Sequence, residues 1–89
     1  MKIIDKKQLK TYLRFSLKND CTIKIYTFKK DRSIVLIKDR NLYLILENGF
    51  YKREFRFLIK NEAIKFAMKL ASIEFKNSHK LYVSISANI

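Results

Sequence analysis

Apolar side chains recur at the spacing of an α-helix between residues 5 and 18, which predicts an amphipathic helix there. Asp5 is a suitable N-cap, and Gln8 three residues later completes the pattern of a capping box. The face opposite the apolar one is basic and contains no acidic side chain. Its residues are Lys7, Lys10, Arg14 and Lys18. This helix is therefore expected to present a row of cations to solvent.

The apolar pattern changes to the period of β-strands after residue 20. Four runs are rich in Ile, Val, Tyr, Phe and Thr, which strands favour, and they cover residues 21–29, 33–38, 42–47 and 50–59. The last two runs are separated by Asn48-Gly49, and both residue types tolerate the positive φ of a type I′ turn. These runs predict an antiparallel four-stranded meander whose last hairpin turns at Asn48-Gly49.

The last third of the chain predicts a second helix, over residues 62–76 with Asn61 as its N-cap, and a strand over residues 80–87. The chain has no Pro and one Gly, so no linker divides it. The predicted fold is a single compact α+β domain over residues 1–89, in the order α-ββββ-α-β. It consists of the antiparallel four-stranded meander plus a C-terminal strand, packed against helices.

Both faces of the central strands are predicted to be apolar. A turn at Asn48-Gly49 pairs Leu46 with Tyr51, and Val35 and Ile37 join the same face. The alternate residues of these strands form a second apolar face, which something must cover. The second helix is apolar over a wide arc, which favours a homodimer. The alternatives are a monomer with one helix on each face and coverage by the bases of a nucleic acid.

The net charge is +12, from 20 Lys and Arg against 8 Asp and Glu. Residues 1–30 alone contain nine basic and two acidic side chains. A self-repelling excess of this size favours a polyanionic partner such as nucleic acid. No run approaches the roughly 18 apolar residues of a membrane span, and no signal-peptide core is present. With a single cysteine, and so no internal disulfide, a cytoplasmic location and no membrane partner are expected.

Aromatic and cationic side chains alternate on the first and fourth predicted strands. Proteins that bind single-stranded nucleic acid stack bases on such rings and follow the phosphates with Lys and Arg. The alternative is that the rings belong to the core or to a dimer contact and that the cations are merely solvated. The candidate nucleic-acid-binding residues are Lys7, Lys10, Arg14, Lys24, Tyr26, Phe28, Lys29, Lys30, Arg32, Tyr43, Lys52 and Arg56.

No enzyme motif is present, and we expect no catalytic residue, cofactor, metal site or small-molecule substrate. The acidic residues mostly mark caps and turns, and no pair has the spacing of a general acid/base or Mg²⁺ site. His79 lies in a predicted loop, and Cys21 opens a strand as a small buried hydrophobe. Glu74 is unusual among apolar helix positions, and an ion pair with Arg53 would explain it.

The leading hypothesis is a small basic protein that binds DNA or RNA largely through the backbone, with single strands as one option. The four-stranded meander followed by a helix is similar in element order to Whirly-type and PUR-type single-strand binders, a resemblance of topology that implies pairing through such helices. The alternative is an interaction or accessory module, of phage or plasmid type, that docks on an acidic protein. A less favoured hypothesis is a small RNA-cleaving toxin that uses His79 and Arg56, although toxins of this kind usually place two helices before the sheet.

Overall fold

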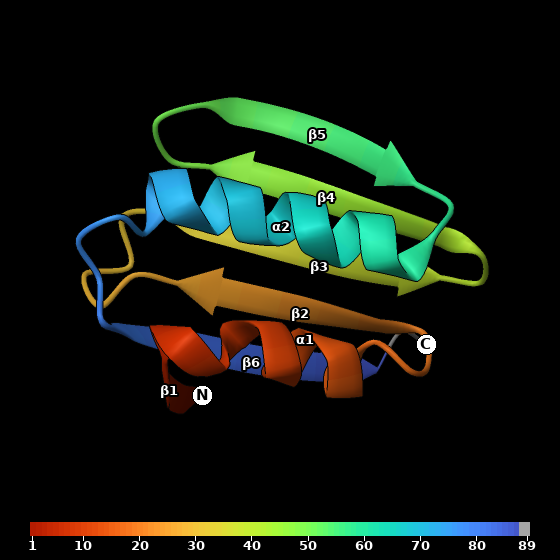
Figure 1. The fold of residues 1–89 in the computed structure, drawn as a ribbon, viewed down its shortest axis with the longest axis horizontal. Helices are drawn as coiled ribbons and strands as arrows, with labels where there is room; N and C mark the ends of the chain where they lie inside the picture. Colours follow the sequence, from red (N-terminus) through yellow and green to blue (C-terminus); the bar gives the residue numbers. More distant parts are fainter. Residues whose placement is uncertain (88–89) are drawn as a thin grey trace.

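A six-stranded antiparallel sheet forms the centre of the molecule (Figure 1). The computed structural model describes residues 1–87. The strands are β1 (Lys2–Asp5), β2 (Cys21–Tyr26), β3 (Ser33–Asp39), β4 (Leu42–Asn48), β5 (Lys52–Phe57) and β6 (Lys80–Ala87). Their order in the sheet is β1-β6-β2-β3-β4-β5, so the last strand of the chain lies between the first two.

Two helices cover the same face of this sheet (Figure 1). They are α1 (Leu9–Ser16), which follows the short 3₁₀ turn η1 (Lys6–Gln8), and α2 (Lys60–Glu74). α2 packs on β3, β4 and β5, and α1 lies beside α2, in front of β2 and β6 in Figure 1. The hydrophobic core fills the space between this helix pair and the sheet. Within residues 1–87 no helix has the length and apolar character needed to cross a membrane.

The α+β fold and the four-stranded meander predicted from the sequence are confirmed. The predicted C-terminal strand is β6, which pairs with β2. The capping box is also confirmed, because Asp5 Oδ1 accepts a hydrogen bond from Lys7 N at 3.2 Å and Gln8 Oε1 accepts one from Asp5 N at 3.0 Å. The predicted first helix begins as a 3₁₀ turn and ends at Ser16. Local capping chemistry was therefore sufficient to locate its start.

The sequence pattern does not predict β1, which adds a sixth strand to the sheet. Its four residues are too few to show a period, and the strand with which it pairs, β6, lies at the other end of the chain. A backbone hydrogen bond of 2.8 Å from Lys6 N to His79 O continues this pairing beyond β1. β1 therefore depends on a long-range contact rather than on its own sequence.

The arrangement with one helix on each face of the sheet, which was the alternative to a dimer, is wrong, since α1 and α2 lie side by side on one face. The apolar face of α1 is fully used there: Leu9 and Leu13 are 0% exposed. α2 in turn buries Ala63, Ala67 and Ala71, small residues that permit close packing. Both helices are thus committed to a single core, and the other face of the sheet is left without a helix.

The register of the β4–β5 hairpin also differs from the prediction. Leu46 pairs with Glu54 rather than with Tyr51, and Asn48 pairs with Lys52. The connection has three residues, 49–51, in place of a two-residue turn. A shift of three positions turns the side chains of β5 to the opposite faces of the sheet, because side chains alternate along a strand.

Contacts from α2 explain this longer connection. Glu74 is 0% exposed, and its Oε1 accepts a hydrogen bond of 2.9 Å from Phe50 N. Its Oε2 lies 3.5 Å from Tyr51 N. Gly49 has no positive φ, so the residue is not needed for a type I′ turn. It is needed for space, because a Cβ at this position would lie 2.7 Å from Glu74 Cδ.

The two edges of the sheet differ in how they avoid pairing with other strands. β1 has only four residues. β5 is longer, but four of its six side chains are charged, namely Lys52, Arg53, Glu54 and Arg56. Short length and charge are the usual means of keeping an edge strand from adding a further strand.

Gly49→Ala should destabilise the protein by about 1–3 kcal/mol, the usual cost of forcing atoms into a well-packed site. Urea denaturation followed by circular dichroism measures this change. In a Glu74→Ala background the same substitution should cost less than about 0.5 kcal/mol, because the side chain that collides with the new methyl group is gone. Equal costs in the two backgrounds would show that Glu74 is not the reason for the glycine.

Candidate nucleic-acid interface

The face of the sheet opposite the helices has an aliphatic centre on β3 and β4. We call this the aliphatic patch; it consists of Val35, Ile37, Leu42, Leu44 and Leu46, each of them half-buried. The strand register places charged side chains around the patch: Lys24 on β2, and Lys52, Glu54 and Arg56 on β5. Apolar surface of this kind, rimmed by charge, marks an interaction surface more often than a solvated one.

Two stacked rings lie at one end of this open face, and we call them the ring pair. Phe28, just after β2, stacks on Tyr82 of β6 with 5.3 Å between ring centroids and an interplanar angle of 22°. Lys30 Nζ lies 5.0 Å from the centroid of Tyr82, within range of a cation–π interaction. Tyr26 is the register partner of Tyr82 on β2. The ring of Phe28 remains 62% exposed and can therefore accept a further stacking partner.

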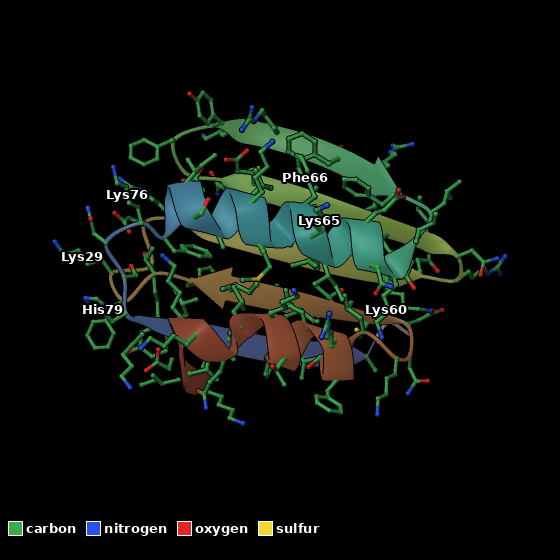
Figure 2. All side chains as sticks on the ribbon, in the orientation of Figure 1. Lys29, Lys60, Lys65, Phe66, Lys76 and His79 are labelled. Carbon is green, nitrogen blue, oxygen red and sulfur yellow. The ribbon has the colours of Figure 1, made fainter. Side chains whose placement is uncertain are left out.

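Phe28 of the ring pair borders a hollow of about 500 Å³ between the β2–β3 and α2–β6 loops. Figure 2 shows Lys29, Lys76 and His79 gathered at this end of the molecule. The basic side chains that line the hollow, or the adjoining groove between η1 and α2, are Lys6, Lys7, Lys29, Arg32, Lys76, His79 and Lys80. Together with Lys30 they form what we call the basic end.

The acidic side chains at the basic end are committed to local structure. Asp31 accepts a hydrogen bond of 2.6 Å from Thr27 Oγ1, and this bond lowers the pKa of Asp31 below its ordinary value. The hydrogen bond from Lys7 N likewise lowers the pKa of Asp5. Glu74 is buried. Seven Lys and Arg side chains at this end therefore face three acids that are held in fixed places, and the surface is strongly positive.

The structure divides the sequence-predicted residues among three surfaces. The basic end and its ring pair receive Lys7, Phe28, Lys29, Lys30 and Arg32. The open face of the sheet receives Lys24, Tyr26, Lys52 and Arg56. Lys10 and Arg14 lie on the exposed side of α1. The cation row of the first helix and the cations of the sheet do not form one surface, because the sheet lies between them.

Tyr43 does not lie with the other candidate rings. It is on the face that the helices cover, packed partly against the core, with Lys38 Nζ 5.8 Å from its ring centroid. It pairs with Phe57 of β5 on that same face. A base on the open face of the sheet could not reach it.

Tyr82, Lys76 and Lys80 are members of the site that sequence reasoning missed. The alternation of residues 80–87 places Tyr82 on the less apolar side of its strand, which is a weak signal. Its importance follows only from the pairing of β6 with β2, which sets Tyr82 beside Tyr26. That pairing joins segments more than 50 residues apart, and no local pattern encodes it.

A buried carboxyl pair lies beneath the 49–51 loop and is the strongest candidate for acid–base chemistry outside the basic end. Glu47 is 2% exposed, and its Oε1 accepts a hydrogen bond from Arg53 Nε at 2.8 Å. The predicted ion pair of Arg53 with Glu74 is therefore wrong, and Glu47 is the partner. Among residues 1–87, Glu47 Oε2 finds no donor, but Glu74 lies within reach as an acceptor.

The pKa of Glu47 is raised and that of Glu74 is lowered, so Glu47 is the carboxyl of the two that binds a proton more tightly. Burial raises the pKa of Glu47, and the nearby Glu74 carboxylate adds to this effect, while the hydrogen bond from Arg53 only partly opposes it. Burial would also raise the pKa of Glu74, but the hydrogen bonds from Glu47 and from the N–H groups of Phe50 and Tyr51 outweigh it and lower that pKa. The pair fixes the loop to the end of α2 and faces the protein interior, so its role is structural.

The remaining reactive side chains among residues 1–87 are Cys21, His79 and the other carboxylates. Within the described residues, His, Cys, Asp and Glu side chains nowhere gather in a group of three that could hold a metal ion. Burial raises the pKa of the Cys21 thiol, which disfavours the nucleophilic thiolate. His79 precedes β6 and Arg56 lies on β5, four strand spacings or about 19 Å across the sheet, so the two cannot act together on one bond.

Comparisons with protein-family models, with curated proteins and with solved structures each give no match. The function of the chain is therefore inferred from its own geometry.

The stability of the Glu47→Gln variant, measured relative to the natural protein, should increase as the pH rises from about 4 to about 8. Folded Glu47 holds its proton more tightly than the unfolded chain does, so its contribution is full below the ordinary pKa of 4.5 and is lost as the pH rises through the raised folded value. Gln is neutral at every pH and can donate to Glu74 in the same way. The lowered pKa of Glu74 makes the stability increase with pH in the natural protein and in the variant alike. Its effect therefore largely cancels when the two are compared.

Thermal denaturation at several pH values measures this difference, with Glu62→Gln on α2 as the control for loss of one exposed carboxylate. A difference between Glu47→Gln and the natural protein that stays constant with pH would show that Glu47 is not the protonated partner.

Proposed function

We propose that this chain is a small cytoplasmic protein that binds single-stranded nucleic acid, DNA or RNA, through its basic end. The observation that carries the proposal is the ring pair of Phe28 and Tyr82, with Lys30 over one ring and the 500 Å³ hollow beside it. Proteins that bind single strands combine exposed rings, on which bases stack, with a positive groove for the backbone. Both parts lie side by side here.

The proposed contacts divide by chemistry. A base stacks on the exposed ring of Phe28, and the adjoining phosphates lie along the cations of the two loops and of η1. The contact residues are Lys7, Phe28, Lys29, Lys30, Arg32, Lys76, His79, Lys80 and Tyr82. Phosphate contacts carry no sequence information, and stacking is tolerant of base identity, so binding should be largely independent of sequence.

The ring pair distinguishes this proposal from docking on an acidic protein. Both use the cations of the basic end, but an acidic protein surface has no need of a flat, exposed ring beside them. An RNA-cleaving activity is not supported, because the residues expected to perform it, His79 and Arg56, lie far apart.

Phe28→Ala should weaken binding to a single-stranded 15-mer by about 5- to 150-fold, since one base–ring stack contributes roughly 1–3 kcal/mol. Fluorescence anisotropy with labelled oligo(dT) and oligo(U) measures the affinities. Phe15→Ala is the matched control: Phe15 on α1 is 67% exposed and has Lys18 Nζ 5.3 Å from its centroid, as Phe28 has a lysine nearby. A duplex of the same length should not distinguish Phe28→Ala from the natural protein, because its bases are already stacked.

The affinity should also fall steeply with salt. If three phosphates are neutralised, a fourfold increase in salt weakens binding to a single strand by roughly twentyfold. Lys29→Ala with Lys80→Ala should lower the log–log slope by about 1.4, whereas Lys65→Ala with Lys69→Ala, on the outer side of α2, should not. Equal effects of Phe28→Ala and Phe15→Ala, or an affinity insensitive to salt, would contradict the proposal.

A further inference from the structure

The aliphatic patch is not explained by the proposed function. It lies on β3 and β4, beside rather than within the basic end, and its side chains have no ring for a base to stack on. Both helices are committed to the other face. A patch of five Val, Ile and Leu side chains at the centre of a sheet is the composition of a sheet-on-sheet interface, in which such side chains interdigitate across about 10 Å.

We propose that the open face packs against the same face of a second copy of this chain, about a two-fold axis that runs parallel to the strands between β3 and β4. This rotation sets β3 opposite β4 of the second copy and β2 opposite its β5. Each residue then faces the residue in the same register row. Val35 lies over Leu46 of the second copy, and Ile37 lies over its Leu44.

The charges around the patch are complementary in this arrangement. Lys24, Val35, Leu46 and Glu54 form one register row from β2 to β5. The axis therefore places Lys24 opposite Glu54 of the second copy, and the symmetry makes this ion pair twice. In the next row Tyr26 faces Lys52 of the second copy, a cation–π arrangement.

The other in-plane axis, perpendicular to the strands, brings like charges together. Placed through the Lys24–Glu54 row at the centre of the patch, it would set Lys24 opposite Lys24 of the second copy, and Glu54 opposite Glu54. Lys52 would meet Arg56, because these two lie at equal distances on either side of the Glu54 row. Like charges in direct opposition disfavour an interface strongly. The charge pattern therefore selects the axis parallel to the strands.

This arrangement has a consequence for the basic end. A rotation about an axis parallel to the strands keeps both basic ends at the same end of the dimer. β6 and β1 lie beyond β2 in the sheet, so they extend past β5 of the second copy and leave the ring pair uncovered. Two basic ends on one side of the dimer can bind one long single-stranded nucleic acid together, whereas a short oligonucleotide can occupy only one of them.

A charge exchange within one chain tests the interface. Analytical ultracentrifugation of nucleic-acid-free protein should give twice the monomer mass at micromolar concentrations. Lys24→Glu and Glu54→Lys should each raise the dimer dissociation constant at least fivefold, because each creates two like-charge pairs per dimer. The double variant with both changes should return to within about twofold of the natural protein, since the pairs are restored with their signs reversed. Lys65→Glu on α2 makes the same charge change as Lys24→Glu and should leave the dimer intact.

The result is independent of the nucleic-acid proposal, because mass is measured without nucleic acid and binding is measured with a short oligonucleotide. A monomeric natural protein, or a double variant no better than the single ones, would overturn the interface. If Lys24→Glu leaves the mass unchanged but weakens binding of a short oligonucleotide, the open face is part of the nucleic-acid surface instead, and the interface is likewise overturned.

Discussion

The antiparallel pairing of β6 with β2 is the interaction on which the rest of the structure depends. It joins the end of the chain to its first long strand and provides β1 with its partner. It also brings the β2–β3 loop beside the α2–β6 loop, and these two loops carry most of the cations of the basic end. Without this pairing Tyr82 would lie far from Tyr26 and Phe28, and no ring pair would exist. A long-range contact in the sheet therefore creates the candidate site.

Local patterns in the sequence were sufficient for the α+β class, the meander and the Asp5–Gln8 cap, because each depends on neighbouring residues. Three features depend on contacts between distant segments, and no local pattern contains them: the short strand β1, the position of both helices on one face, and the β4–β5 register. The β4–β5 register is the clearest case, because Asn48-Gly49 has the residue types of a tight two-residue turn. A single buried carboxylate from α2 overrides that preference. The candidate site was predicted only in part for the same reason. Its cations in the β2–β3 loop belong to a local sequence pattern, whereas Tyr82 and Lys80 reach the site through the pairing of β6.

The end of α2 organises the basic end. Lys6 Nζ donates a hydrogen bond of 2.8 Å to Phe75 O, and Arg32 Nη1 donates one of 3.3 Å to Glu74 O. Cations at the C-terminus of a helix also interact favourably with its dipole. The backbone at the end of the helix therefore holds two distant cations in place, Lys6 of η1 and Arg32 of the β2–β3 loop, while Glu74 holds the 49–51 loop through its side chain. Flexible loops that carry cations gain a fixed geometry in this way, which lowers the entropy lost when a ligand binds.

The charged edge strand β5 has a consequence for the size of any assembly. Strand addition at a sheet edge repeats without limit and produces fibres, because each added copy exposes a new edge. A contact about a two-fold axis uses the same surface on both copies, so it is saturated after one association. With charges along β5 and only four residues in β1, the sheet is protected at its edges and apolar at its centre. The self-association that we propose is thereby directed toward a closed pair rather than an open polymer.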